Sequence, residues 1–207
     1  MKKAISVTEL LSMRMETLPL DGAWRDAFGE PERHGVWFVW GRSGSGKTTF
    51  VLQLCKELCR FGRVAYDSLE EGACKTMQDA FIRTGMQDVA RRLVLLDCED
   101  MASLSARLKK RRSPDFVVID SLQYTGMNYS DFKRLKESHR DKLLIFISQA
   151  RGTLPSTRVG VSVMYDAGLK IWVEGYRAFS KGRTFGDKGY YTVWPERAER
   201  YWGDSDV

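Results

Sequence analysis

The segment from residue 41 to residue 48 constrains this chain more than any other. It reads Gly-Arg-Ser-Gly-Ser-Gly-Lys-Thr, which fits the pattern G-x-x-x-x-G-K-T of a phosphate-binding loop. An apolar run at 36–40 precedes it and predicts a buried strand, and apolar residues at helical spacing follow it. A strand, a glycine-rich loop and a helix in this order bring backbone N–H groups and a helix N-terminus around a phosphate.

The loop predicts which residues bind a nucleoside triphosphate. We expect Lys47 to place positive charge near the terminal phosphates and the Thr48 hydroxyl to bind Mg²⁺. The residues expected to contact the nucleotide are Gly41, Arg42, Ser43, Gly44, Ser45, Gly46, Lys47, Thr48 and Thr49.

Length and composition bound the class of protein. The chain has 207 residues with 43% hydrophobic and 29% charged residues, which suits one globular α/β domain with a sizeable core. It contains no apolar run long enough to span a membrane and no signal-peptide stretch. The four cysteines include no C-x-x-C pair, so we expect reduced thiols, no zinc site and a cytoplasmic location.

The net charge of +6 favours polyanionic partners. The densest basic run lies at 107–112, at the end of an amphipathic segment. Two interpretations stay open for it: a solvated helix C-terminus, where cations favour the helix dipole, or a contact with DNA or another subunit.

The alternation of apolar runs with helical patterns predicts an α/β fold. We expect βαβ units with a mostly parallel central sheet flanked by helices. The expected strands are 36–40, 63–68, 92–97, 116–120 and 143–148, and the expected helices are 73–84, 102–112 and 131–139. Beyond residue 168, alternating segments predict antiparallel strands added at the C-terminal end: 169–173, 176–179 and 190–194. We expect one domain over 1–207, with residues 1–30 as an extension that packs on the core and starts with a short helix at 7–12.

Three side chains at strand ends predict hydrolytic chemistry. Asp120 closes an apolar strand, where its carboxylate could hold Mg²⁺ opposite Thr48. Glu70 follows the strand after the P-loop helix, where it could act as general base. Alternatively, Glu70 and Glu71 are a pair of acids in a solvated turn or at a helix N-terminus. Gln149 closes the next apolar strand and could sense the γ-phosphate through a hydrogen bond.

Two further segments contain basic residues that could contact phosphates. Residues 150–158 are polar, basic and glycine-containing, and could form either a loop that touches DNA phosphates or a plain connection. Lys181 and Arg183 flank a glycine between two late strands, where a cation pair could reach a phosphate bound by a neighbouring subunit.

This set of motifs resembles the RecA-like ATPase core, which includes RecA, DnaB, KaiC and bacterial RadA. The motifs are G-R-S-G-S-G-K-T, Y-D-S-L-E-E, F-V-V-I-D-S, F-I-S-Q and K-G-R-T-F-G, in that order. The resemblance covers about residues 20–195 and is strongest to small stand-alone RadA/DnaB-like ATPases of bacteriophages and mobile elements. It implies ATP and Mg²⁺ as cofactors, with a RecA-like fold and a homo-oligomer in the form of a hexameric ring or a filament.

The resemblance also implies roles for single residues. Lys47 and Thr48 would be the Walker A pair, Asp120 the Walker B acid, Glu70 the catalytic glutamate and Gln149 the sensor. Lys181 and Arg183 look like a K-x-R finger that acts on a neighbour, although Thr184 interrupts the match to the K-N-R-F-G motif. The zinc module and protease-like domain of RadA, the helical collar of DnaB and the second core of KaiC have no counterpart here.

These observations predict an oligomeric, Mg²⁺-dependent ATPase that acts on DNA in recombination, repair or replication, with single-stranded DNA as the expected partner. One alternative is a KaiC-like switch that acts on a protein. Another is a P-loop kinase of small molecules, for which residues 107–112 would have to act as an arginine-rich lid.

Overall fold

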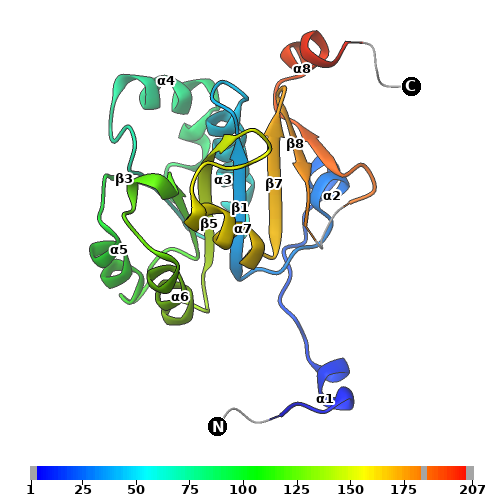
Figure 1. Ribbon diagram of the computed structural model, residues 1–207, viewed down its shortest axis with the longest axis vertical. Helices are drawn as coiled ribbons and strands as arrows, with labels where there is room; N and C mark the ends of the chain where they lie inside the picture. The colour runs from blue at the N-terminus through cyan, green and yellow to red at the C-terminus, as the bar shows by residue number, and fades with distance from the viewer. Residues whose placement is uncertain (1–3, 183–185, 204–207) are drawn as a thin grey trace.

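A computed structural model describes residues 4–182 and 186–203 of the chain (Figure 1). A central β-sheet carries helices on both of its faces. The strands are β1 (Gly35–Gly41), β2 (Val64–Ser68), β3 (Leu93–Asp97), β4 (Phe116–Asp120), β5 (Leu143–Arg151), β6 (Leu154–Pro155), β7 (Leu169–Glu174), β8 (Arg177–Ser180) and β9 (Tyr190–Thr192). The helices are α1 (Val7–Ser12), α2 (Gly22–Phe28), α3 (Lys47–Leu58), α4 (Lys75–Arg83), α5 (Met101–Leu108), α6 (Tyr129–Ser138), α7 (Arg158–Asp166) and α8 (Pro195–Trp202), with the short 3₁₀ helices η1 (Met86–Val89) and η2 (Leu122–Tyr124).

The sheet is mostly parallel and becomes antiparallel at its C-terminal end. Its strand order is β3-β2-β4-β5-β1-β7-β8-β9, and β6 pairs with β5 alone. All pairings from β3 to β7 along this order are parallel, whereas β8 pairs antiparallel with β7 and β9 antiparallel with β8. The predicted α/β class, central parallel sheet and late antiparallel strands are thereby confirmed.

One strand runs differently from the expectation. The segment predicted at 169–173 as an added antiparallel strand is β7, which pairs parallel with β1. The cause is α7, a helix that the sequence analysis did not predict. It carries the chain back across the sheet after β5, so that β7 starts from the same end as β1.

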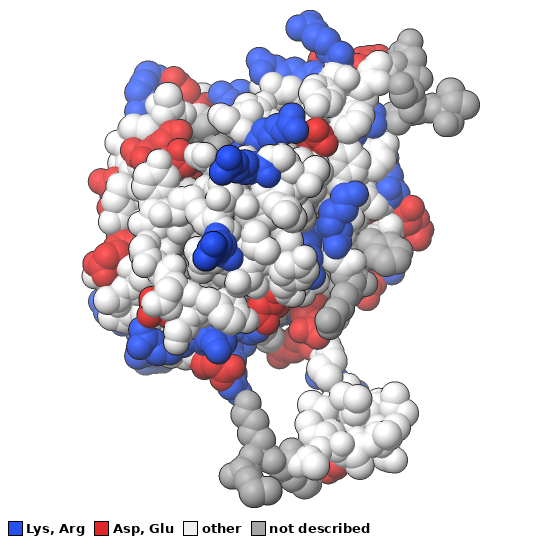
Figure 2. Space-filling model, in the orientation of Figure 1, with Lys and Arg blue, Asp and Glu red and all other residues white. Residues whose placement is uncertain are grey.

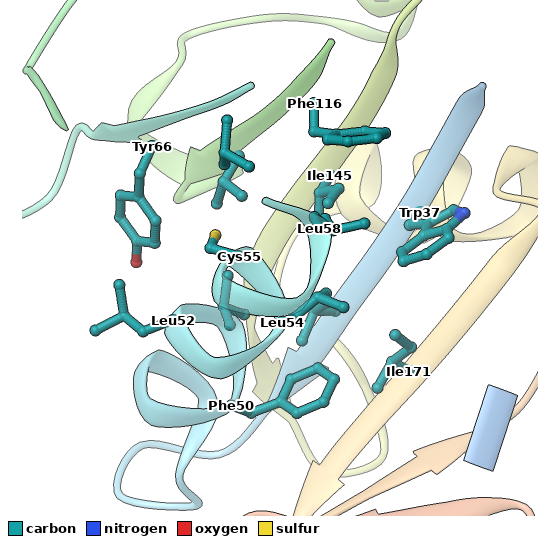
Figure 3. Packing of buried hydrophobic residues seen from close by; sticks show 14 of the residues in the cluster. Trp37, Phe50, Leu52, Leu54, Cys55, Leu58, Tyr66, Phe116, Ile145 and Ile171 are labelled. Carbon is teal, nitrogen blue, oxygen red and sulfur yellow. The ribbon is translucent and has the colours of Figure 1, made fainter. Parts of the chain in front are cut away.

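The P-loop helix α3 lies in the centre of the larger hydrophobic core. Its side chains Phe50, Leu54 and Leu58 recur every four residues and are fully buried. They lie towards Trp37 on β1 and Ile171 on β7 in Figure 3. Burial of this helix against β1 fixes the position of the loop that joins them.

The helices divide between the two faces of the sheet. Residues of α2, α3 and α4 belong to the core cluster that contains Trp37 and Val39. Residues of α5, α6 and α7 pack on the opposite face, in the cluster that contains Phe38 and Trp40. The alternation of neighbouring residues of β1 between the two clusters is the period of a strand that is buried on both sides.

The N-terminal extension packs on the core over only part of its length. Leu18 and Phe28 are fully buried, and Trp24 stacks on Tyr191 with ring centroids 4.0 Å apart. The predicted helix at 7–12 is present as α1, but it has no buried residue and lies away from the sheet in Figure 1. A capping box between Ser6 and Glu9 accounts for the helix locally, since each side chain bonds the other's backbone N–H.

Other boundaries differ by a few residues. The helix expected over 102–112 is α5, which ends at Leu108, so most of the basic run lies in the turn that follows. The segment 150–158 forms the β5–β6 hairpin and the start of α7. Within the described residues, no helix has the length and apolar character needed to cross a membrane.

Candidate nucleotide site

The carboxyl ends of β1, β2, β4 and β5 meet at one edge of the sheet. Gly41 at the end of β1 lies opposite Gln149 on β5, and Ser68 at the end of β2 lies opposite Asp120 on β4. Since β5 lies between β1 and β4, Gln149 on β5 lies between the P-loop and the strand that ends at Asp120. The topology thus gathers the side chains that the sequence places far apart.

The P-loop borders a cavity of about 420 Å³ at this edge. Gly44 and Gly46 adopt positive φ angles of 72° and 99°, which L-side chains rarely adopt. We call this space the P-loop cavity. Its lining residues are Ser43, Gly44, Gly46, Lys47, Thr48, Thr49, Ser68, Glu70, Glu71, Met77, Arg83, Asp120, Ser121, Ile147, Ser148, Gln149, Tyr176, Trp194 and Arg197.

Most of the predicted nucleotide ligands belong to this lining. Of the nine residues expected to contact the nucleotide, Gly41, Arg42 and Ser45 do not line the cavity. Gly41 instead packs against β7, and the buried hydroxyl of Ser45 has no hydrogen-bond partner among the described residues.

The Lys47 side chain is held by its own loop. Its Nζ donates to the carbonyl oxygens of Gly41 at 2.9 Å and Arg42 at 2.7 Å. Burial lowers the pKa of the Lys47 amine, while the nearby charges of Asp120 and Glu70 act in the opposite direction. The ammonium group therefore stands at the cavity wall with two carboxylates close to it.

Asp120 is oriented by a tyrosine that the sequence analysis did not identify. The hydroxyl of Tyr66, from β2, donates a hydrogen bond to Asp120 Oδ2. Burial raises the pKa of Asp120 to about 6, against the opposing effect of the Tyr66 hydrogen bond. Burial also raises the pKa of the Tyr66 phenol well above its usual range, so the phenol remains a donor.

Glu70 is held at both of its carboxylate oxygens. Gln149 Nε2 donates to Glu70 Oε1 at 3.2 Å, and Ser121 Oγ donates to Glu70 Oε2 at 3.3 Å. Glu71 instead accepts a hydrogen bond from Thr76 at the start of α4, at 2.7 Å. Of the acidic pair, Glu70 is thus the residue that joins the other predicted site residues, and Glu71 supports the helix start.

The far end of the cavity is aromatic. Tyr176 forms the turn between β7 and β8, and its backbone N–H donates to the carbonyl of Ser45 in the P-loop at 3.2 Å. Trp194 and Arg197 come from the start of α8, with the guanidinium carbon of Arg197 4.2 Å from the Trp194 ring centroid. These residues were not among the site residues predicted from the sequence. A proline at the first position of α8 is a helix-start signal that could have pointed to them.

Lys181, one of the two predicted finger residues, does not line this cavity within one chain. Lys181 lines a different groove, with Trp40, Thr153 and Leu154, and its backbone N–H bonds Lys170. Arg183 lies outside the described residues. The basic run at 107–112 does not line the P-loop cavity either, and Arg107 pairs with Glu99 at 2.7 Å. The described arrangement therefore does not place this run at the P-loop cavity, where a lid would be needed.

Metal binding depends on a small set of oxygen donors. Among the described residues, no group of three or more His, Cys, Asp and Glu side chains could hold a metal ion alone. Thr48 and Asp120 both line the P-loop cavity. One hydroxyl and one carboxylate fit Mg²⁺, which commonly takes its remaining ligands from substrate phosphates and water.

The chain matches no protein-family model and no curated protein sequence.

Proposed function

We propose that this protein is a Mg²⁺-dependent ATPase with a RecA-like core. One observation carries the proposal: Glu70 is held by Gln149 and Ser121 in the same cavity as Lys47 and Asp120. A P-loop alone would fit any nucleotide-binding protein. A positioned carboxylate across the cavity from the P-loop lysine adds the group that hydrolysis needs.

Each side chain has a role in this proposal. Lys47 and the N-terminus of α3 bind and neutralise the phosphates. Thr48 and Asp120 would hold Mg²⁺, which would neutralise charge on the phosphate oxygens. Glu70 orients a water and accepts its proton, and Gln149 reports the presence of the γ-phosphate through its bond to Glu70.

Phosphate release and nucleotide affinity, measured on matched variants, test the assignment. We expect Glu70→Gln to lower kcat about 10²–10⁴-fold, the range of general-base catalysis, with MgATP affinity kept. Lys47→Ala should weaken MgATP binding itself. Glu71→Gln is the control, because Glu71 bonds Thr76 rather than Gln149. Equal activity of Glu70→Gln and Glu71→Gln would remove Glu70 from the mechanism.

We further propose that the hairpin of β5 and β6 couples this site to single-stranded DNA. Gln149 and the exposed Arg151 lie on the same strand, and the Ser156 N–H returns to the Gln149 carbonyl at 2.9 Å. The Trp40 indole holds the hairpin carbonyl of Thr153 at 3.0 Å. A movement of Gln149 would therefore act directly on a basic hairpin.

Salt dependence separates this DNA role from a protein partner. Basic side chains lie scattered among uncharged ones on the face seen in Figure 2, so we expect a modest number of phosphate contacts. Single-stranded DNA should raise the ATPase rate. Arg151→Ala should weaken DNA binding and should reduce the slope of the logarithm of the binding constant against the logarithm of salt concentration by about one, the value expected for one lost phosphate contact. ATPase activity that DNA leaves unchanged would instead favour the KaiC-like switch.

The role of Lys181 and Arg183 requires a second copy, and we propose that the chain forms a homo-oligomer. Mixing Lys47→Ala with Arg183→Ala chains should restore part of the activity, because one intact composite site can form between them. No recovery at any mixing ratio would exclude an arginine that acts on a neighbour.

A further inference from the structure

The aromatic end of the P-loop cavity supplies none of the groups to which the proposed function assigns a role. Tyr176, Trp194 and Arg197 line the same cavity as the catalytic groups but come from the β7–β8 turn and from α8. Figure 1 places α8 beyond the β7–β8 turn, at the same end of the molecule as the cavity edge of the sheet. These elements follow the P-loop by more than a hundred residues in the sequence, yet the fold brings them to the same cavity.

The three side chains form one packed unit. Arg197 donates to the Tyr176 hydroxyl at 3.0 Å, and its guanidinium carbon lies 5.4 Å from the Tyr176 ring centroid. The rings of Tyr176 and Trp194 meet edge to face at 73°, with centroids 6.3 Å apart. Trp194 is half-buried and Arg197 is exposed, so both keep surface that faces the cavity opening.

The P-loop itself fixes this unit in place. A Cβ on Gly46 would lie 3.1 Å from the Tyr176 ring, so Tyr176 sits directly against the loop. The Tyr176 N–H bonds Ser45, and the Tyr176 carbonyl accepts from Val193, next to Trp194. A ligand whose phosphates lie on the P-loop therefore meets this unit on its non-phosphate side.

We propose that Tyr176, Trp194 and Arg197 form the base subsite of the nucleotide site, which holds a nucleobase by stacking. This inference rests on the proposed function and names what the rest of the cavity binds. Aromatic rings and a planar guanidinium both stack on the face of a base, and such contacts contribute to binding whichever base is present. The Tyr176 hydroxyl, the polar group that could read a base edge, already accepts from Arg197.

Comparison of MgATP with inorganic tripolyphosphate tests the subsite, because tripolyphosphate carries the phosphates without a base. We expect Arg197→Ala and Trp194→Ala to weaken MgATP binding about tenfold and to leave tripolyphosphate affinity unchanged. Arg197→Lys keeps the charge but loses the planar group, so it should behave as Arg197→Ala does. Arg200→Ala, an exposed arginine of α8 outside the cavity lining, is the control and should leave both affinities unchanged.

A fluorescence change supplies a second readout that does not depend on hydrolysis. MgATP should change the tryptophan emission of the unmodified chain, tripolyphosphate should not, and Trp194→Phe should remove most of the change. Equal loss of MgATP and tripolyphosphate in Arg197→Ala, with Arg197→Lys restoring both, would make Arg197 a phosphate ligand and overturn the subsite. Failure of both ligands to bind the unmodified chain would overturn the proposed function and this inference together.

Discussion

A single hydroxyl group, that of Tyr66, decides how Asp120 is presented to the cavity. Tyr66 is fully buried and donates to Asp120 Oδ2. Partners of this kind hold a metal-binding side chain in its working orientation, and their loss commonly costs 10–100-fold in metal affinity or activity, roughly. Tyr66→Phe keeps the ring and removes only the donor.

We therefore expect Tyr66→Phe to raise the Mg²⁺ concentration needed for half-maximal ATPase activity about tenfold. The protein should stay folded, since the ring still fills its place in the core. Tyr165→Phe is the matched control, because Tyr165 is exposed and lies on α7. A Mg²⁺ dependence that matches the unmodified chain would mean that Asp120 does not need Tyr66.

His139 predicts a pH dependence of stability that is separate from the nucleotide site. It is 3% exposed, and its Nε2 lies 2.8 Å from Ser105 Oγ. Burial lowers the pKa of His139 below its ordinary value of 6.5, with Lys109 and Lys142 acting in the same direction and Asp141 against it. Below pH 6.5 the unfolded chain then binds more protons than the folded one, so the free energy of unfolding falls as the pH falls.

Urea unfolding at pH 5.0 and pH 7.5 measures this effect. The unmodified chain should gain more stability between the two pH values than His139→Gln, which cannot titrate. The same pH dependence in both chains would assign the acid sensitivity to other groups.

Among the elements, the pairing of β1 with β7 depends on a residue without a side chain. A Cβ on Gly41 would lie 2.2 Å from the carbonyl oxygen of Val173, on the neighbouring strand. Backbone cannot move aside as a flexible side chain can, so β1 and β7 would have to separate. We expect Gly41→Ala to lower the free energy of unfolding by about 1–3 kcal/mol and the Tm by several degrees.

Gly168→Ala tests whether this cost is specific to the strand contact. A Cβ on Gly168 would meet only the Val36 carbonyl, at 3.8 Å, and its backbone lies outside the left-handed region. Its Tm should stay close to that of the unmodified chain. An equal fall in Tm for Gly41→Ala and Gly168→Ala would mean that the loss comes from replacing any glycine, and not from the close approach of β7 to β1.

The elements also explain which parts of the architecture the sequence could predict. Strands such as β4 and β5 are apolar runs with polar ends, and α3 repeats apolar residues at helical spacing, so local patterns suffice. The direction of β7 depended on α7, whose start follows a polar hairpin that looked like a loop. Glu70, Asp120 and Gln149 followed from their places at strand ends. Tyr66, Tyr176 and Arg197 reach the site through tertiary contacts: the proline at the start of α8 signals a helix, but not that this helix lies at the cavity.

The described residues expose several apolar surfaces, and two of them lie on different elements, α1 and α4. The arm that carries α1 is mostly uncharged in Figure 2, and Leu11 is 81% exposed. A second surface lies between α4, η1 and β3, as a groove of about 810 Å³ that includes Phe81, Ile82 and Leu95. A six-residue helix is marginal in water without a packing partner.

We expect the arm of one copy to dock in the groove of the next. Two different surfaces that fit each other make a head-to-tail contact, which closes into a ring or extends as a filament. Leu11→Glu in the arm and Ile82→Glu in the groove should then each reduce the assembly seen by light scattering, to a similar extent. Tyr129→Glu, at an exposed aromatic residue of α6 outside both surfaces, should leave it unchanged. Loss of assembly in Leu11→Glu but not in Ile82→Glu would mean that the arm binds elsewhere on the neighbouring copy. An unmodified chain that stays monomeric with MgATP would contradict the oligomer itself.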